Sequence, residues 1–180
     1  HKKNVLVEAE LGTLAGIEDE VKAEKNIYTN PNEAKKFVEL TNCDSLAVAI
    51  GTSHGAYKFS GDSKLNMEIL SEIESLIPNT PLVLHGASSV PQKYVDLLNK
   101  FGGNVTGAKG VDESLLSEAC HKHNICKINS DTDLRICFTG AVRKYLTENP
   151  EVFDLRKYLG AGKEEVKNLL IEKIKLLGKF

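Results

Sequence analysis

Two histidines in this chain stand at matching places after apolar segments. His54 follows Ser45–Ile50 in the sequence IGTSHG, and His85 follows Pro81–Leu84 in PLVLHG, with a glycine directly after each histidine. If the two segments are successive parallel strands, both imidazoles lie close together, and neutral imidazole is a common nitrogen ligand of zinc. A catalytic zinc usually takes three protein ligands, so the pair predicts two ligands of a metal site. For either histidine alone, a hydrogen-bonded core residue is the alternative.

Small hydroxyl residues follow three of the apolar segments. They are Thr52 and Ser53, Ser88 and Ser89, and Ser130 and Thr132. Their backbone N–H groups and hydroxyls would lie near the starts of following helices, where the helix dipole favours anions. Lys58 and Arg135 can supply the countercharge for a phosphate. Each pair taken singly is also ordinary turn chemistry, so the phosphate prediction depends on their convergence.

One acidic side chain lies in a long segment that contains several glycines. Glu18 belongs to the sequence GIED within residues Gly12–Thr29. Connections of this length are usually functional lids or disordered. A carboxylate on a lid can transfer a proton once substrate binding excludes water. A solvated acidic loop is the alternative interpretation.

Three polar side chains follow the last apolar segment of this kind. Asn129, Asp131 and Asp133 form the sequence NSDTD. The motif lacks the glycine and the distal glutamate of an EF-hand, so contact with a substrate hydroxyl or carbonyl fits better than calcium binding. An aspartate-capped helix that begins near Thr132 is the alternative for one aspartate. By contrast, we expect His121 and His123 to be surface residues, because their spacing on a helix points them apart.

Four predicted strands, alternating with helices, position these residues. The strands are Val5–Glu10, Ser45–Ile50, Pro81–Leu84 and Ile125–Asn129. A first helix is capped by Asn30 and begins at Pro31. Further helices are predicted at 64–77, 90–101, 112–123, 134–146 and 162–177 from their apolar periodicity. This alternation is typical of parallel βα units.

Two α/β architectures compete at this point, a doubly wound open sheet and part of a (β/α)8 TIM barrel. No G-x-G-x-x-G motif supports a dinucleotide-binding doubly wound fold. A barrel places its chemistry at the carboxyl ends of its strands, and all four strand ends here are polar, including Glu8 and Glu10. Four βα units plus a C-terminal helix are half a barrel. We therefore expect residues 1–180 to be the C-terminal half of a single barrel domain, with the other strands preceding His1.

Composition excludes several classes of partner. The formal net charge of −2 produces no global field for nucleic acid or anionic lipid. The apolar runs are shorter than the roughly 20 residues that span a bilayer. The four cysteines show no CxxC spacing, which favours reduced thiols in a cytoplasmic protein. We expect a small phosphorylated ligand, with no nucleic acid and no membrane.

Taken together, the motifs VEAELG, GIED, AIGTSHGAYK, LVLHGASSVP, KINSDTDLR and FDLRKYLG resemble those of class II, zinc-dependent fructose-1,6-bisphosphate aldolases. The resemblance runs in family order from Val7 to the end of the chain. It implies a TIM barrel that reversibly cleaves fructose 1,6-bisphosphate to dihydroxyacetone phosphate and glyceraldehyde 3-phosphate. Zinc acts as the Lewis acid in this family. His54 and His85 would be two zinc ligands, while the third ligand and a catalytic aspartate are expected before His1.

The same resemblance implies roles for other residues. Glu18 would exchange a proton with the dihydroxyacetone carbon, Glu10 would lie near the metal, and Asn129 would contact substrate oxygens. Arg135 would bind the second phosphate, commonly across a subunit boundary, which implies a homodimer or homotetramer. The shell around the ketose phosphate and a monovalent cation (Na⁺ or K⁺) would comprise Gly55, Lys58, Gly86, Ser88, Asp131 and Thr132.

Two alternatives remain open at the level of sequence. Tagatose-1,6-bisphosphate aldolases differ from this family in the configuration of one substrate hydroxyl, and Asp131 followed by Thr132 and Asp133 looks more like the fructose branch. A non-catalytic phosphate-binding barrel would keep the binding loops without the third ligand and the catalytic aspartate. We expect the enzyme.

Overall fold

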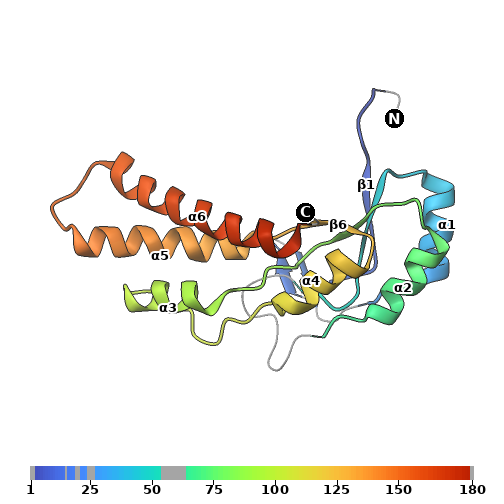
Figure 1. Ribbon diagram of the computed structural model, residues 1–180, viewed down its shortest axis with the longest axis horizontal. Coiled ribbons are helices and arrows are strands. Elements are labelled where there is room, and N and C mark those ends of the chain that lie inside the picture. Colours follow the sequence, from blue (N-terminus) through green and yellow to red (C-terminus); the bar gives the residue numbers. More distant parts are fainter. Residues whose placement is uncertain (1–2, 15, 19–20, 24–26, 54–63, 179–180) are drawn as a thin grey trace.

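Four parallel strands form the central sheet of the computed structural model, which describes residues 3–14, 16–18, 21–23, 27–53 and 64–178 (Figure 1). The strands pair in the order β1-β4-β5-β6. Their bounds are β1 Glu8–Leu11, β4 Ser45–Val48, β5 Leu82–Leu84 and β6 Ile125–Ile128. The four predicted strands and their parallel arrangement are therefore confirmed. The described strands form an open sheet, so closure into a barrel stays a prediction.

Helices follow the strands, as the sequence predicts. Their bounds are α1 Pro31–Thr41, α2 Met67–Leu76, α3 Gln92–Lys100, α4 Glu113–Lys122, α5 Thr132–Glu148 and α6 Leu155–Leu177. The side chain of Asn30 accepts hydrogen bonds from the N–H groups of Asn32 and Glu33, so the predicted cap of α1 is confirmed. The helix predicted to begin at Val90 begins instead at Gln92. Pro91 disfavours a helical conformation in the residue before it.

The last helix is longer than predicted, because it begins at Leu155 rather than at Gly162. Asp154 caps it by accepting a hydrogen bond of 3.0 Å from the N–H of Arg156. Gly160 and Gly162 both lie inside the helix. Glycine is a poor helix former, which is why the sequence pattern alone places the start too late. No helix in the described part of the chain is long and apolar enough to cross a membrane.

The segment Gly12–Thr29 contains regular structure, whereas the sequence predicts a loop. Strands β2 (Gly16–Glu18) and β3 (Val21–Ala23) pair in antiparallel register. The segment is closed at its base by two hydrogen bonds of 2.9 Å between the backbones of Thr13 and Ile27. Backbone polar groups that leave the sheet need partners, and a hairpin provides them within the segment.

The two faces of the sheet differ in chemistry. Alternate strand residues such as Leu46, Val48 and Leu82 are buried against α1, α2 and α4 in the main apolar core. The opposite face carries Glu10, whose register partner in β4 is Ala47. One face is therefore hydrophobic and covered by helices. The other face carries a charged side chain on the edge strand β1.

A second apolar core lies between α3, α5 and α6. It includes Val95, Leu98, Ile136 and Leu169. Figure 1 shows α5 (orange) and α6 (red) as two long neighbouring helices, with α3 beside them. This helix group carries the C-terminal part of the chain back to the sheet, which lets α6 reach the strand ends.

Two glycines of α6 have opposite surroundings. A Cβ atom added at Gly162 would lie 2.5 Å from Cε2 and 2.6 Å from Cδ2 of Phe138 on α5, whereas a Cβ added at Gly160 would meet no atom within 4 Å. The contact between α5 and α6 therefore needs a residue without a side chain at position 162, and position 160 has no such requirement.

We predict opposite effects for the two glycine-to-alanine substitutions. Gly160→Ala should raise the free energy of unfolding by about 0.5–1 kcal/mol, because alanine loses less entropy in a helix. Gly162→Ala should lower it by about 1 kcal/mol or more, because overpacking exceeds that helical gain. Urea unfolding of the full-length protein measures both. A stabilising Gly162→Ala would contradict the close approach of the two helices.

Candidate functional site

His85 lies between two carboxylates at the carboxyl end of the sheet. Its Nε2 atom is 3.1 Å from Oε1 of Glu8, and its Nδ1 atom is 3.3 Å from Oε2 of Glu10. The histidine directly follows β5, and both glutamates belong to β1. The imidazole side chain is 21% exposed, so the cluster is open to a ligand from the charged face. The structure thus brings together His85 and Glu10, two of the residues selected from the sequence.

Lys127 joins this cluster, although sequence reasoning did not select it. Its Nζ lies 2.9 and 2.8 Å from the two carboxylate oxygens of Glu8. Between β5 and β6, Leu82 pairs with Ile125 but Val83 pairs with Lys127, so Cys126 in β6 is an extra residue at a register shift. Such a bulge re-aims the side chains that follow it. A strict two-residue alternation would have put Lys127 on the same face as Ile125, which explains why no pattern signalled it.

The charge of Lys127 affects the acid strength of Glu8. The hydrogen bond from Lys127 is the largest influence and lowers the pKa of Glu8, partial burial acts in the opposite direction, and the hydrogen bond with His85 adds to the lowering. Glu8 is therefore ionised near neutral pH and available as a hydrogen-bond acceptor for an imidazole N–H.

The carboxyl ends of β4 and β5 approach each other closely. Gly86 has φ +58°, and a Cβ atom there would lie 2.8 Å from the backbone carbon and oxygen of Ser53. The residue after His85 therefore touches the residue before His54. His54 itself lies outside the described residues, as do Gly55 and Lys58. Thr52 is buried, and its hydroxyl has no hydrogen-bond partner within the described part of the chain.

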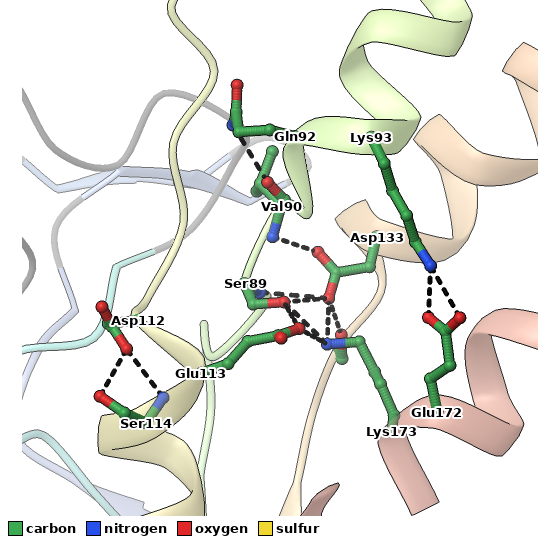
Figure 2. Close-up of polar contacts among 11 residues, drawn as sticks. Ser89, Val90, Gln92, Lys93, Asp112, Glu113, Ser114, Asp133, Glu172 and Lys173 are labelled. Carbon is green, nitrogen blue, oxygen red and sulfur yellow. Dashed lines mark hydrogen bonds and ion pairs between the residues drawn. The ribbon is translucent and has the colours of Figure 1, made fainter.

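A buried polar network lies behind the loop that follows β5 (Figure 2). Asp133 is fully buried, and its carboxylate accepts hydrogen bonds of 3.1 Å from the N–H of Ser89 and 2.7 Å from the N–H of Val90. The hydroxyl of Ser130 donates to the same carboxylate at 2.8 Å. The Nζ of Lys173 in α6 lies 2.7 Å from Oδ2 of Asp133.

The lysine decides the ionisation of this buried acid. Burial alone would raise the pKa of Asp133, but the charge of Lys173 and its hydrogen bond, together with the Ser130 hydroxyl and the Val90 N–H, lower the pKa below its ordinary value. Asp133 is thus an ionised carboxylate in the protein interior. The sequence suggested a substrate contact or a helix cap for the NSDTD motif, and Asp133 instead joins two loops.

The remaining residues of that motif lie near the same loop. The N–H of Asn129 donates to the carbonyl of Leu84 at 2.9 Å, and its carbonyl accepts from the N–H of Ala87 at 3.3 Å. Asp131 makes no side-chain cap bond to α5. Its Oδ2 lies 2.6 Å from Nε of Arg135, and both side chains are largely exposed. The side chain of Asp131 therefore faces solvent, with the guanidinium group of Arg135 beside it.

Three further residues named from the sequence have different outcomes. Ser88 is buried, and its carbonyl accepts a hydrogen bond of 3.0 Å from the N–H of Val111. His123 is not a free surface residue, because its Nδ1 lies 2.7 Å from Oε2 of Glu74 and its side chain is 12% exposed. The backbone of Glu18 lies in β2, and its side chain falls outside the described atoms.

The chemistry of the donors fits a zinc ion in part. A metal-binding histidine usually donates its other ring N–H to a carboxylate, and each nitrogen of His85 has a carboxylate within 3.3 Å. Imidazole nitrogen and carboxylate oxygen are both ligands that zinc accepts. Among the described residues, no group of three or more histidine, cysteine, aspartate or glutamate side chains is arranged to hold a metal. The described residues therefore provide one imidazole, that of His85, with the carboxylates of Glu8 and Glu10 beside it.

Several known proteins are similar to this chain. A fructose-bisphosphate aldolase from Giardia intestinalis is 48% identical over 180 residues, which are 99% of this chain and 55% of that protein. One from Thermus caldophilus is also 48% identical over 180 residues, covering 99% of this chain and 58% of the relative. One from Helicobacter pylori is 47% identical over the same shares. The chain thus spans just over half the length of the curated relatives it matches.

Solved structures agree at the level of the fold. The YdjI aldolase from Escherichia coli K12 is 31% identical with a TM-score of 0.67, covering 99% of this chain and 51% of that chain. The structure described as a putative fructose-1,6-biphosphate aldolase from Coccidioides immitis has a TM-score of 0.69, covering 98% of this chain and 53% of its own. At 22% identity, the latter supports only the fold.

The family comparison covers every residue. A sequence model of the family described as "Fructose-bisphosphate aldolase class-II" matches residues 1–180. The strand-end cluster around His85 lies within that match, as do the loops after β5 and β6. This chain therefore belongs to the class II fructose-bisphosphate aldolase family.

Proposed function

We propose that the full-length protein is a zinc-dependent aldolase that reversibly cleaves fructose 1,6-bisphosphate to dihydroxyacetone phosphate and glyceraldehyde 3-phosphate. The observation that carries this proposal is the position of His85 between Glu8 and Glu10 at the carboxyl edge of a parallel sheet, in a chain that matches the family throughout. Active sites of barrel enzymes lie at this edge. A phosphorylated sugar is the substrate class in this proposal.

The metal would be held by His85 and His54. The closeness of Gly86 to Ser53 supports this pairing, because those residues neighbour the two histidines in sequence. A metal-bound imidazole keeps one N–H, so either Glu8 at Nε2 or Glu10 at Nδ1 would accept it and thereby fix the plane and the tautomer of the His85 ring. When bound, zinc supplies Lewis-acid chemistry toward the ketone oxygen of the substrate. The third ligand would come from residues other than these 180.

The side chains of this chain would hold and move the proton. Cleavage breaks the C3–C4 bond as the C4 hydroxyl gives its proton to the catalytic aspartate expected outside these 180 residues. It leaves an electron pair at C3 of the dihydroxyacetone half, which must then gain a proton. Glu18, carried on the β2–β3 hairpin, would deliver that proton, and would remove it again in the condensation. Asn129 would donate to substrate oxygens from its place beside the β5 loop. Glu10 would keep the metal side of the site negative.

The two phosphates would be bound at two places. Gly86, Ser88 and Thr132 would offer backbone N–H groups and hydroxyls near the start of α5 to the ketose phosphate, with Lys58 as countercharge. Asp131 would hold a monovalent cation next to it. Arg135, whose side chain is 74% exposed, would reach the second phosphate, across a subunit boundary in a homodimer or homotetramer.

The rest of the protein would complete the barrel. Glu8, Cys126 and Lys127, on strands at the two edges of the described sheet, are exposed, whereas β4 and β5 between them are almost entirely buried. Exposed strand edges are poorly tolerated in solution. We propose that residues 1–180 form the C-terminal half of one barrel domain in a cytoplasmic enzyme, whose remaining strands cover these edges.

The first prediction from this proposal concerns the reaction. The full-length protein should cleave fructose 1,6-bisphosphate, and a chelator of divalent metals should remove this activity until zinc is restored. A coupled assay for glyceraldehyde 3-phosphate measures it. Tagatose 1,6-bisphosphate serves as the comparison substrate and should be cleaved at least ten times less efficiently. Equal use of both sugars would remove the choice of fructose, and cleavage of neither would remove the proposal.

The second prediction concerns the metal ligand. His85→Ala should lose bound zinc and cleavage together, because no other described imidazole lies at this edge. His121→Ala is the matched control, since within the ranges that the structure describes His121 bonds only the backbone carbonyls of Ser117 and Gly178 and the Ser117 hydroxyl. Zinc content by atomic absorption and turnover are the measurements. Full zinc occupancy in His85→Ala would exclude this residue as a ligand.

The third prediction concerns the proton donor. Glu18→Ala should lower kcat by about 100-fold or more with little change in KM, because general acid–base groups contribute on the order of 10²–10⁴ in rate. Glu33→Ala, which removes an exposed carboxylate of α1, should leave both constants unchanged. An unchanged kcat in Glu18→Ala would make the hairpin a purely structural feature.

A further inference from the structure

We propose that Lys173 is a positioning residue for the substrate-phosphate loop. Lys173 belongs to the C-terminal helix α6, far in sequence from the loop Gly86–Val90 that it would hold in place. The inference deepens the proposed function and rests on it, because the loop is one wall of the proposed phosphate site. Neither the motifs nor the strand-end pattern pointed to Lys173.

Lys173 is buried at the centre of a polar network (Figure 2). Its Nζ lies 2.7 Å from Oδ2 of Asp133, 2.9 Å from the Ser89 hydroxyl and 3.8 Å from Oε1 of Glu113. The Ser89 hydroxyl donates to Oε1 of Glu113 at 2.9 Å. A lysine is rarely this buried unless it is paired, and the two carboxylates and the hydroxyl around Lys173 provide that pairing.

Asp133 transmits the position of Lys173 to the backbone of the loop. One carboxylate oxygen accepts the N–H of Ser89, and the other accepts the N–H of Val90. An ionised carboxylate accepts strongly through both oxygens, whereas a protonated one becomes a donor at one of them, and without Lys173 this buried acid would bind a proton more readily. Lys173 therefore keeps Asp133 ionised, and the Asp133 carboxylate holds the two consecutive backbone N–H groups of Ser89 and Val90.

The loop needs such a restraint because its backbone is strained. Val90 has a φ angle of 50°, in the left-handed region that β-branched residues rarely adopt. Strained backbone persists only where its surroundings over-determine it, and such positions cluster at functional sites. Gly110 packs below the loop so closely that a Cβ atom there would lie 2.3 Å from the carbonyl oxygen of Ser88.

The strain lies next to the proposed ligand groups. Ser88, whose amide and hydroxyl are proposed to bind phosphate, directly precedes the two residues that Asp133 holds. Displacement of binding groups by about 1 Å is enough to weaken a site strongly. Release of the Ser89 and Val90 amides would therefore move the phosphate-binding groups of Gly86 and Ser88 without removing any of them.

An exposed ion pair between α3 and α6 offers a matched control. Lys93 and Glu172 form an ion pair of 2.6 Å beside the network, with side chains 54% and 56% exposed. Glu172 precedes Lys173 directly, and Figure 2 shows both pairs in one view. In Figure 2 the dashed lines of this pair join Lys93 to Glu172 and reach neither Ser89 nor Val90, so its loss tests for general effects of charge removal near α6.

The experiment uses full-length protein and measures KM for fructose 1,6-bisphosphate, kcat, and the Kd of inorganic phosphate by calorimetry. Lys173→Met should raise KM and the phosphate Kd at least tenfold while kcat falls less than threefold. Lys173→Arg, which keeps the charge, should return both constants to within threefold of wild type. Lys93→Met should leave them unchanged. All measurements are made well below the thermal midpoint of each variant.

A second variant keeps the test decisive if Lys173→Met does not fold. Asp133→Leu combined with Lys173→Met replaces the ion pair by apolar residues, which buried sites often tolerate, and still removes the acceptor for Ser89 and Val90. It should show the same tenfold loss of phosphate affinity. A folded variant of either kind with wild-type KM and phosphate Kd would overturn the proposal and make the pair merely structural.

The outcomes separate this inference from the proposed function. Wild-type cleavage with unchanged constants in the variants would overturn the role of Lys173 alone. If the wild type binds phosphate but cleaves no sugar bisphosphate, weaker phosphate binding in the variants would support the role of Lys173 while the proposed function fails. A wild type that neither cleaves nor binds phosphate would overturn both.

Discussion

The parallel pairing of β1, β4, β5 and β6 is the constraint on which the rest of this structure depends. Parallel strands must be joined by crossovers, so every strand delivers its carboxyl end to the same edge of the sheet. The shared register of these strands also brings Glu8, the first residue of β1, to His85, 77 positions later, and to Lys127, 119 positions later. No local interaction could assemble this cluster, and any antiparallel strand would send its polar end to the opposite edge.

Two kinds of charge pair surround this edge, and they differ in burial. The cluster of Glu8, His85 and Lys127 lies on the open, charged face, where an incoming ligand can compete for its hydrogen bonds. The pair of Asp133 and Lys173 is buried behind the loop and bonds backbone amides. Exposed pairs are weak and adjustable, whereas a buried pair is costly to break. The arrangement suits a rigid support behind a site that must bind and release.

Much of this arrangement was predictable where the signal is local. The strands, the cap of α1 at Asn30 and the place of His85 at a strand end follow from short segments of sequence. Where the signal is not local, prediction was incomplete. The strands of the β2–β3 hairpin have only three residues each, too few for a clear apolar alternation, and α6 continues through two glycines because α5 packs against it. The roles of His54, Gly55 and Lys58 remain predictions, because those residues lie outside the described ranges.

The sequence by itself determined the alternation of strands and helices, the polar residues at the strand ends and the family to which the chain belongs. Periodicity and strand-end motifs encode these features over a few residues each. Only the tertiary structure decided that a bulge at Cys126 turns Lys127 toward Glu8, and that Asp133 faces Lys173 and two loop amides rather than solvent. Register shifts and buried ion pairs depend on residues distant in the chain, and their geometry exists only once the sheet and α6 are packed together.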